Sequence, residues 1–426
     1  MFKPIADIAS KINNWPKERI FRTLNYSIPF LIGVHIFLKP MPFEAVDEFC
    51  FYLAIFILLL LLFFRKTVFT LRSPLTLPFI LFFLWAVLGL FFTLDFKNTL
   101  HDLRAHLLEY LIIFYLLVNY FNSPKRLKIL AFIAIASATF FSIGAVIQYY
   151  FIEGFPFNSR LGYTFREMCT NRIGFITIMG ICLSLHFLYK SKNILLKILL
   201  VNCFSIMTIT TLLTQSRASF FGLLAALLIL CFHNRKNIIF IILTILIIII
   251  LVPNSGKRIS NINGYTKDLR LKIYRLTIEV IKNHPITGIG FGMQIYGNQN
   301  VLDLENLNNQ LPPEYQQKKP IFGTPHNTIL DITVRTGIVG LLLFLSILTA
   351  SLRMLWKTLV LKKNEYFKSW ALCLLACICS FMILASFSDT ASGVKAIVFY
   401  TILAMINILW NLTRSYANKT IIPAKH

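Results

Sequence analysis

Two arginines and one histidine are the residues of this chain best suited to chemistry, because each lies in a distinctive local sequence. Arg217 lies in a tight Thr-Gln-Ser-Arg-Ala-Ser turn (residues 214–219) between two apolar runs. Arg270 lies on a helix expected over residues 268–283, and His326 follows a Thr-Pro pair. Guanidinium forks suit phosphate oxygens, and a neutral imidazole can accept a proton from a hydroxyl group. These residue types indicate an anion clamp beside a general base.

Each of the three residues also has a plainer interpretation. Arg217 could reach outer phospholipid headgroups while its stem lies along apolar surface. The helix of Arg270 carries further cations and could lie on anionic headgroups, and a single histidine in an outer loop is often inert. In favour of the clamp, Ser216 or Thr214 could cap the helix that follows Arg217, and a helix N-terminus favours an anion.

The residues around His326 predict a helix that continues into the membrane. Thr324 is expected as its N-cap and Pro325 at its first position, and Asp331 and Arg335 form an i, i+4 pair along it. His326 would then stand roughly 15 Å above the glycine at position 337. A helix N-terminus disfavours imidazolium, so we expect this histidine to be neutral.

Several further residues are expected to support these three. Tyr274 shares a helix face with Arg270, so its hydroxyl could meet the same ligand. Asp389, in the last outer turn, could orient His326 or pair with an arginine. The outer loop at 151–171 adds surface cations, of which the first is the best candidate for the site: Arg160, Arg166 and Arg172.

The composition predicts an all-α protein that crosses a membrane many times. The chain of 426 residues is 57% hydrophobic and yet carries a net charge of +24. Nucleic-acid binding is not indicated, because the cations fall between apolar runs long enough to span hydrocarbon. We expect twelve spans, near residues 23–39, 49–64, 76–93, 105–121, 128–150, 172–189, 194–213, 216–232, 237–253, 337–356, 369–388 and 393–411.

The distribution of cations predicts the orientation. With a cytoplasmic N-terminus, the inner segments hold 24 of the 42 Lys and Arg residues but only three of the 18 acids. Cytoplasmic loops carry such an excess of cations, so both termini are expected in the cytoplasm and Arg217, Arg270 and His326 outside. No cleavable signal peptide is apparent.

The sequence predicts three regions. Spans one to nine with short loops occupy residues 1–253, and one long outer loop occupies residues 254–336. Spans ten to twelve with a tail occupy residues 337–426. Within the loop, glycines at 288, 290 and 292 resemble no phosphate-binding loop and are expected to form a turn. The polar stretch that contains Pro312-Pro313 is expected to be mobile. A loop of this length in a compact protein is usually functional.

Acids and cysteines do not indicate a cofactor. Glu44, Asp47 and Glu48 could hold a divalent metal in principle, but they lack a tight Asp-x-Asp spacing and are expected to be solvated. Most cysteines lie within spans as packing groups. Cys50 and Cys169 lie near the outer face and could pair in an oxidising compartment. Neither a metal nor a nucleotide is expected, and the chemistry that fits is group transfer from a lipid pyrophosphate to an alcohol.

Three motifs in order resemble the bacterial O-antigen ligases, within the superfamily that also holds O-antigen polymerases and protein O-oligosaccharyltransferases. The first is the Thr-Gln-(Ser/Thr)-Arg-Ala turn, met by residues 214–218 with Gln215 at its second position. The second is an Arg-Leu-x-x-(Tyr/Trp) helix before His-Pro-x-x-Gly-x-Gly, met by residues 270–274 and 284–290. The third is His-(Asn/Ser/Gln), nine residues and Gly-x-x-Gly, met by His326, Asn327, Gly337 and Gly340. With the twelve spans and the long loop, the resemblance covers essentially the whole chain.

The resemblance implies a metal-independent, inverting membrane glycosyltransferase of the C class in the bacterial inner membrane. It would move polysaccharide from undecaprenyl pyrophosphate to a sugar hydroxyl of the lipid A-core in the periplasm. His326 would activate the acceptor, Arg217 and Arg270 would bind the pyrophosphate, and Asp389 matches an acidic position in the last outer loop.

Three other functions stay open. A polysaccharide polymerase would use the same donor with a second lipid-linked glycan as acceptor. A protein O-oligosaccharyltransferase fits less well, because those chains tend to be longer at the C-terminus. A transporter would predict charges at mid-membrane and similar halves, and neither is evident in the sequence.

Overall fold

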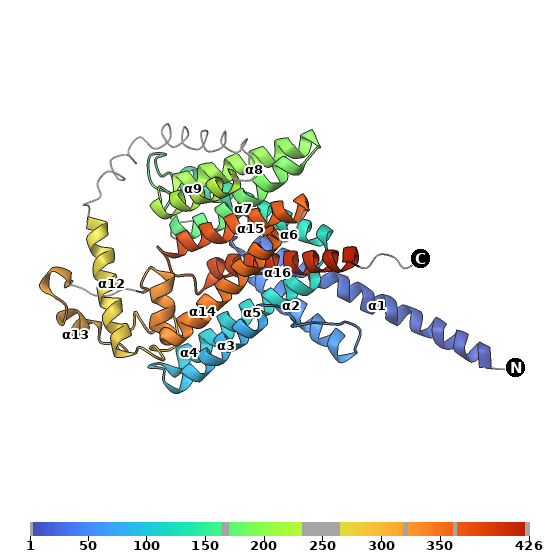
Figure 1. Cartoon of the computed structure of the whole chain (residues 1–426), viewed down its shortest axis with the longest axis horizontal. Helices are drawn as coiled ribbons and strands as arrows, with labels where there is room; N and C mark the ends of the chain where they lie inside the picture. The colour runs from blue at the N-terminus through green and yellow to red at the C-terminus, as the bar shows by residue number, and fades with distance from the viewer. Residues whose placement is uncertain (1–2, 163–169, 232–264, 318–322, 361–363, 422–426) are drawn as a thin grey trace.

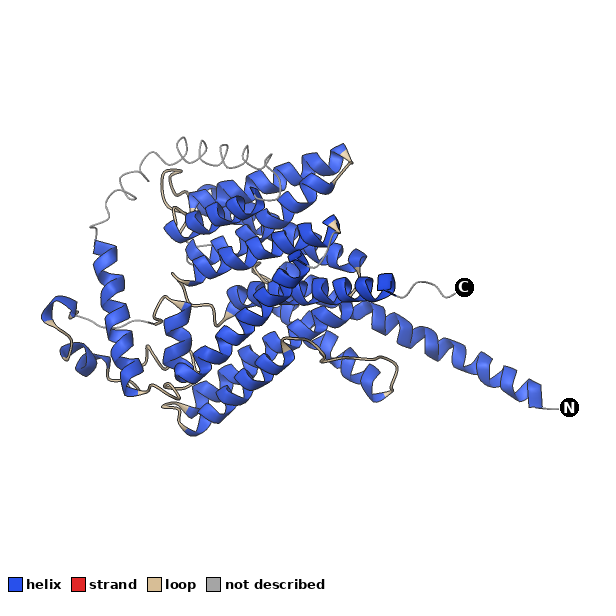
Figure 2. Cartoon of the chain, in the orientation of Figure 1, coloured by secondary structure: helices blue, strands red, loops and turns tan. Residues whose placement is uncertain are grey.

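The computed structural model describes residues 3–162, 170–231, 265–317, 323–360 and 364–421, and every regular element in these ranges is helical (Figure 2). Nine of the described helices are long and apolar enough to cross a membrane. The chain is therefore an all-α, multi-pass membrane protein, as the composition predicted.

The helices follow the expected spans closely. Those that meet the length and hydropathy of a span are α1 (Lys3–Leu38), α2 (Glu44–Phe63), α4 to α5 (Phe96–Asp102 and Glu109–Tyr120, joined by the π-helical turn Leu103–Leu108), α6 (Pro124–Val146, extended by Ile147–Ile152), α7 (Thr170–Lys190), α8 (Ile194–Leu213), α14 (Thr328–Val360), α15 (Glu365–Ala385) and α16 (Gly393–Ile421). Two shorter apolar helices are α3 (Thr76–Leu88, extended by Gly89–Phe91) and α9 (Arg217–Cys231). These elements coincide with eleven expected spans, and the twelfth, 237–253, lies outside the described residues.

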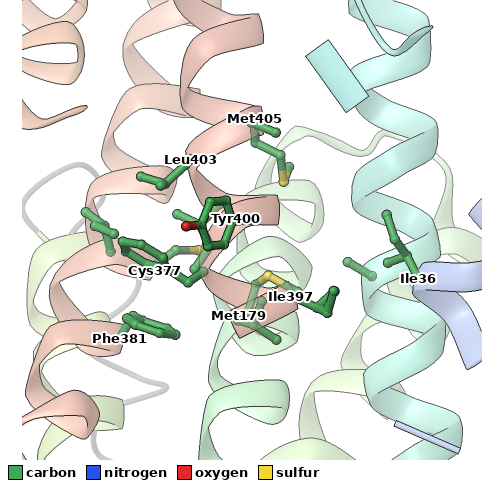
Figure 3. Packing of buried hydrophobic residues seen from close by; sticks show 14 of the residues in the cluster. Ile36, Met179, Cys377, Phe381, Ile397, Tyr400, Leu403 and Met405 are labelled. Atoms are coloured by element: carbon green, nitrogen blue, oxygen red, sulfur yellow. The ribbon is translucent and has the colours of Figure 1, made fainter. Parts of the chain in front are cut away.

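Two helices form the interior of the bundle. In the spanning windows of α7 and α16, 83% and 89% of the residues are buried, against 33% in α8. Figure 3 shows the core between them, where Met179 from α7 and Tyr400 from α16 lie near Cys377 and Phe381 of α15. The interior cysteines of these helices are buried packing groups, as expected.

Both ends of the chain lie on the same side of the bundle. The beginning of α1 and the end of α16 point away from α12 (Tyr265–Asn283) and α13 (Leu304–Asn309), which lie at the opposite end (Figure 1). An even number of crossings agrees with this arrangement, while the compartment on each side stays a prediction.

The helix expected to start at Thr324 differs from the observed α14 in two ways. It begins at Thr328, and it is interrupted at Gly337, whose φ of 67° and ψ of −175° are not helical. A Cβ at Gly337 would lie 1.9 Å from the carbonyl oxygen of Ile286, so only glycine fits. The expectation of one continuous helix was wrong, because the segment after α12 packs directly against the chain at this point.

The interruption frees backbone groups, and the segment 285–290 pairs with them. The amides of Ile289 and Gly290 donate to the carbonyls of Val334 (2.8 Å) and Arg335 (3.2 Å), and the carbonyl of Pro285 accepts from the amide of residue 338 (2.8 Å). The indole of Trp85 donates to the freed carbonyl of residue 336 (2.8 Å). Buried backbone groups must be paired. The segment 285–290 therefore has two roles: it forms the turn out of α12, and it pairs with the backbone groups that the interruption in α14 leaves free.

The segment between α9 and α14 has, in its described part, a core of its own. Apolar side chains of α12, α13, the loops beside them and the first turns of α14 form this cluster: Leu276, Val280, Ile289, Ile295, Tyr296, Leu302, Leu304, Leu307, Leu311 and Val334. A short 3-10 helix, Pro313–Tyr315, packs on α12. The stretch around Pro312-Pro313 thus contacts α12, while its expected mobility stays a prediction.

Two other expectations concern the outer surface near α2. Asp47 is fully buried rather than solvated, and its carboxylate lies 3.3 Å from the ammonium group of Lys39. Glu44 and Glu48 are exposed, as expected. Cys50 is buried and forms no disulfide with any described residue, and Cys169 lies outside the described residues.

The interruption in α14 gives a first prediction. Gly337→Ala forces a side chain into a left-handed conformation against the carbonyl of Ile286, and the backbone strain alone costs about 1–3 kcal/mol. We expect a clear fall in the thermal unfolding midpoint of the purified protein, followed by tryptophan fluorescence.

The control for this variant is Gly89→Ala, at a helical glycine where an added Cβ meets no atom within 4 Å. Such a substitution stabilises by up to about 1 kcal/mol. Equal midpoints for the two variants would contradict the proposed role of Gly337.

Candidate active site

The loop between α15 and α16, residues 386–390, is where three distant parts of the chain meet. Its backbone carbonyls accept from side chains of other elements. Asn327 Nδ2 donates to the carbonyl of residue 386 (3.1 Å), Asn171 Nδ2 to that of residue 387 (3.1 Å) and Thr328 Oγ1 to that of residue 388 (2.7 Å). The loop therefore fixes the start of α14 and the start of α7 relative to each other.

The turn that carries Arg217 is joined to the same loop through α7. Ser216 Oγ donates to Asn171 Oδ1 (2.7 Å) and also accepts from the amide of Ser219 (3.3 Å), so Ser216 is the N-cap of α9. Arg217 is the first residue of α9, and its side chain is exposed. Arg217 therefore lies at a helix N-terminus, in a turn that Asn171 links to the 386–390 loop.

The outer loop after α6 supports this turn. Arg160 Nε donates to the carbonyl of Thr214 (2.8 Å), and Gln215 Nε2 donates weakly to the carbonyl of Asn158 (3.4 Å). Gln215 has a φ of 46°, so the turn is tight at this residue. Arg160 and Gln215 thus make backbone contacts that shape the turn, while Arg166 lies outside the described residues.

Arg270 approaches the loop from the extramembrane side. Its guanidinium carbon lies 5.4 Å from the ring centroid of Phe387, within the range of a cation–π contact. Tyr274, one turn along α12, is half-buried, and within the described residues no hydrogen bond joins its hydroxyl to Arg270. The structure therefore brings Arg270 to the loop without showing the expected convergence of Tyr274.

His326 lies just outside α14 rather than on its first turn. Asn327 is the observed N-cap, because its Oδ1 accepts from the amides of Ile329 (2.9 Å) and Leu330 (3.2 Å). His326 precedes this cap with a φ of 52°, a left-handed conformation uncommon for a residue with a Cβ. The expected cap at Thr324 is corrected accordingly.

A hydrogen-bonded chain links His326 to Asp389 through Thr324. The hydroxyl of Thr324 lies 3.3 Å from His326 Nδ1 and donates to Asp389 Oδ1 at 3.5 Å. With that hydroxyl proton directed at the carboxylate, the consistent tautomer carries the proton on Nδ1 and the lone pair on Nε2. Nε2 is then the atom able to take a proton. Asp389 contacts His326 indirectly, and not as the direct partner that the sequence suggested.

Lys395 is a member of this cluster that sequence reasoning missed. Its ammonium group lies 2.6 Å from Asp389 Oδ2 and 3.4 Å from Ser388 Oγ, and its side chain is 2% exposed. Burial acts to raise the pKa of Asp389, but Lys395, with a smaller contribution from Arg172, outweighs this effect and lowers the pKa below its usual value. The lysine falls inside an apolar run in the sequence, so its position gave no signal of an outer site.

The surroundings of His326 favour its neutral form, although the residue is partly accessible to solvent. Desolvation lowers the pKa of the imidazole, and the charges of Arg270 and Lys395 lower it further against the opposing effect of Asp389. The neutral state was expected from a helix N-terminus. The main cause in the structure is instead the partial removal of the ring from water.

A second polar cluster supports the start of α16. Asp102, His106 and Tyr110 are spaced four residues apart, with the Tyr110 hydroxyl 3.3 Å from His106 Nδ1 and the Asp102 carboxylate 3.6 Å from Nε2. The hydroxyl also accepts from the amide of Gly393 (2.8 Å), two residues before Lys395. The i, i+4 spacing of polar residues in an apolar helix was visible in the sequence and was not used.

The expected ion pair in α14 is present and buried. Arg335 Nη1 lies 3.5 Å from Asp331 Oδ2, and Arg335 Nε donates to the carbonyl of Phe291 (2.9 Å). This pair fastens the segment 284–292 to α14 below His326, so it positions the site without facing it.

Comparison with known families agrees with this geometry. Residues 202–345, which include Arg217, Arg270 and His326, match the family model described as O-antigen ligase. This match supports a relationship between the chain and the O-antigen ligase superfamily. A search of curated proteins gives no match. The matched family supports a membrane glycosyltransferase of the ligase and polymerase type.

The electrostatics of the site give a second prediction. Asp389→Asn removes the one charge that raises the pKa of His326, so that pKa should fall further below its usual value. Titration of 15N-histidine-labelled protein by NMR, with the His326 signal assigned by His326→Gln, measures this shift. At a pH above the pKa of His326 in both proteins, the ring is neutral in each, so their spectra should agree. The difference between wild type and Asp389→Asn should appear at lower pH, where the variant needs more acid to be protonated.

The matched control is Glu365→Gln, which removes an exposed acid at the other end of α15 and should leave the titration of His326 unchanged. A rise in the pKa of His326 in Asp389→Asn would refute this account of the site.

Proposed function

We propose that this protein is an O-antigen ligase that transfers polysaccharide from undecaprenyl pyrophosphate to lipid A-core. The observation that carries the proposal is the linkage of three separate elements to one five-residue loop. Arg270 contacts Phe387 directly, the Arg217 turn is linked through Asn171, and His326 is linked through Thr324. Arginines beside a neutral imidazole suit the departure of a pyrophosphate and the activation of an alcohol.

In the proposed reaction His326 is the general base. Its Nε2 takes the proton of the acceptor hydroxyl as the oxygen forms a bond to the anomeric carbon. The bond between that carbon and the pyrophosphate oxygen breaks on the opposite face, so the anomeric configuration inverts. The electron pair leaves with undecaprenyl pyrophosphate, and the protonated imidazole is stabilised by Asp389 through Thr324.

The arginines have separate roles in this proposal. Arg217, at the N-terminus of α9, would hold one phosphate together with the helix dipole. Arg270, above Phe387, would hold the other and stabilise the charge that develops on the leaving group. Asn327 and Arg160 position the base and the turn rather than contacting the reacting atoms.

The orientation of the protein supports a reaction at the outer surface of the bacterial inner membrane. The excess of Lys and Arg predicts that both termini are cytoplasmic, and α1 and α16 begin and end on the side away from the site (Figure 1). The donor and the acceptor would then reach the site from the periplasmic leaflet.

The roles of the three residues give a third prediction. His326→Ala and Arg217→Ala should each abolish attachment of long glycan to lipid A-core, and Arg270→Ala should reduce it at least tenfold, since removal of one such donor costs about 10²–10³ in rate. Lipopolysaccharide gels from a ligase-null strain that carries each variant measure the attachment.

A suitable control is Arg275→Ala, on the same helix as Arg270 but in contact with Tyr315 instead of the loop. It should give a normal ladder, and each variant should be present in the membrane at the wild-type level. Normal ladders from His326→Ala or Arg217→Ala would end the proposal.

A fourth prediction separates the ligase from a polymerase. Loss of a ligase blocks only the last transfer, so undecaprenyl-linked polymer should accumulate in a deletion strain. Loss of a polymerase would leave only single repeat units on the lipid. Extraction of the lipid-linked pool, mild acid release and sizing of the glycan distinguish these outcomes, and single units alone would assign the polymerase function.

A further inference from the structure

A groove lies between α14 and α16 at the end of the bundle opposite the candidate active site. It measures about 680 Å³, and its walls include Arg353 and Lys357 of α14 and Trp410 of α16. Arg353 lies 16 residues beyond Gly337, which corresponds to roughly 24 Å along the helix. The hydrocarbon core is about 30 Å thick, so the two cations lie near the far surface of the membrane.

The two cations of the groove share one helix face, because they are four residues apart. Like charges in this arrangement repel each other. Within the described residues, no carboxylate lies within 4.0 Å of either Arg353 or Lys357. A third cation lies near the groove, because the guanidinium carbon of Arg414 is 6.0 Å from the ring centroid of Trp410. The groove therefore presents positive charge that favours an anion.

The ring of Trp410 forms part of the wall of the groove. Its Nε1 is buried, and no acceptor for it is found in the described part of the chain. A buried donor without an acceptor is unfavourable.

The rest of the groove is apolar and open towards the bilayer. Leu342 and Leu345 of α14 are exposed, and they lie about two to three turns from Arg353 in the direction of the membrane centre. The small side chains of Ser346 and Ala350 leave the hollow between them. A molecule that fits has a negatively charged head and one or more hydrocarbon chains.

From these features we infer that the groove binds one anionic phospholipid of the leaflet opposite the active site. The phosphate lies between Arg353 and Lys357, and the rest of the headgroup lies beside the ring of Trp410. An acyl chain follows the wall formed by Leu342 and Leu345. Basic pockets between helices near the membrane surface bind anionic headgroups in this way, and the inference does not depend on the proposed glycosyl transfer.

Native mass spectrometry and thermal unfolding of the delipidated full chain test this site. The probes are phosphatidylglycerol and phosphatidylcholine with identical acyl chains. We expect phosphatidylglycerol to be retained and to raise the unfolding midpoint of the wild type by several degrees. The double variant R353Q/K357Q should bind it roughly 30-fold more weakly, from about 1 kcal/mol per lost cation.

Two further variants complete the experiment. K190Q/K192Q removes two exposed cations at the same end of the bundle but outside the groove, and should behave as the wild type. Ala350→Phe fills the hollow and should weaken binding without a change of charge. Equal binding of the two lipids by the wild type, or wild-type affinity in R353Q/K357Q, would overturn the inference even if Ala350→Phe fails to fold.

Discussion

Hydrogen bonds to the backbone of the 386–390 loop are the constraint on which the candidate site depends. Three consecutive carbonyls accept side-chain donors from the starts of α7 and α14. Side chains that lie more than 100 residues apart in sequence are therefore held by one short segment. The loop joins α15 to α16, which is almost entirely buried, so its position is set by the core of the bundle. A transferase that must align a donor and an acceptor needs this kind of rigid support.

The charged groups around the 386–390 loop are also placed by the helices that the loop joins. Lys395 is brought out of an apolar run by the first turn of α16, and it fixes Asp389 as a carboxylate. Asp389 in turn accepts from Thr324, and the tautomer of His326 consistent with this contact has Nε2 as the acceptor. The lysine therefore affects the base through two intermediates. We regard it as a positioning residue, in contrast to the arginines proposed to contact the donor.

Much of this architecture could be predicted from the sequence, because long apolar runs and the cations between them are direct consequences of the bilayer. The Arg217 turn could also be predicted, since a capping serine before an apolar run marks a helix start. The interruption of α14 could not be predicted. It depends on a contact between Gly337 and Ile286, which are about 50 residues apart, and local spacing indicates only an ordinary helix. Lys395 was missed for a similar reason, because its partner lies in a loop with no periodic pattern.

The attachment of α12 has a mechanical consequence. Residues 285–290, directly after α12, are bonded to the interruption in α14, and the middle of α12 packs through Leu276 in the cluster with α13. Arg270 lies 13 residues before Asn283, roughly 20 Å from the bonded end of the helix. The height of the guanidinium above the 386–390 loop is therefore set by the pairing of this segment with α14. A change at Gly337 would displace Arg270 as well as destabilise the bundle.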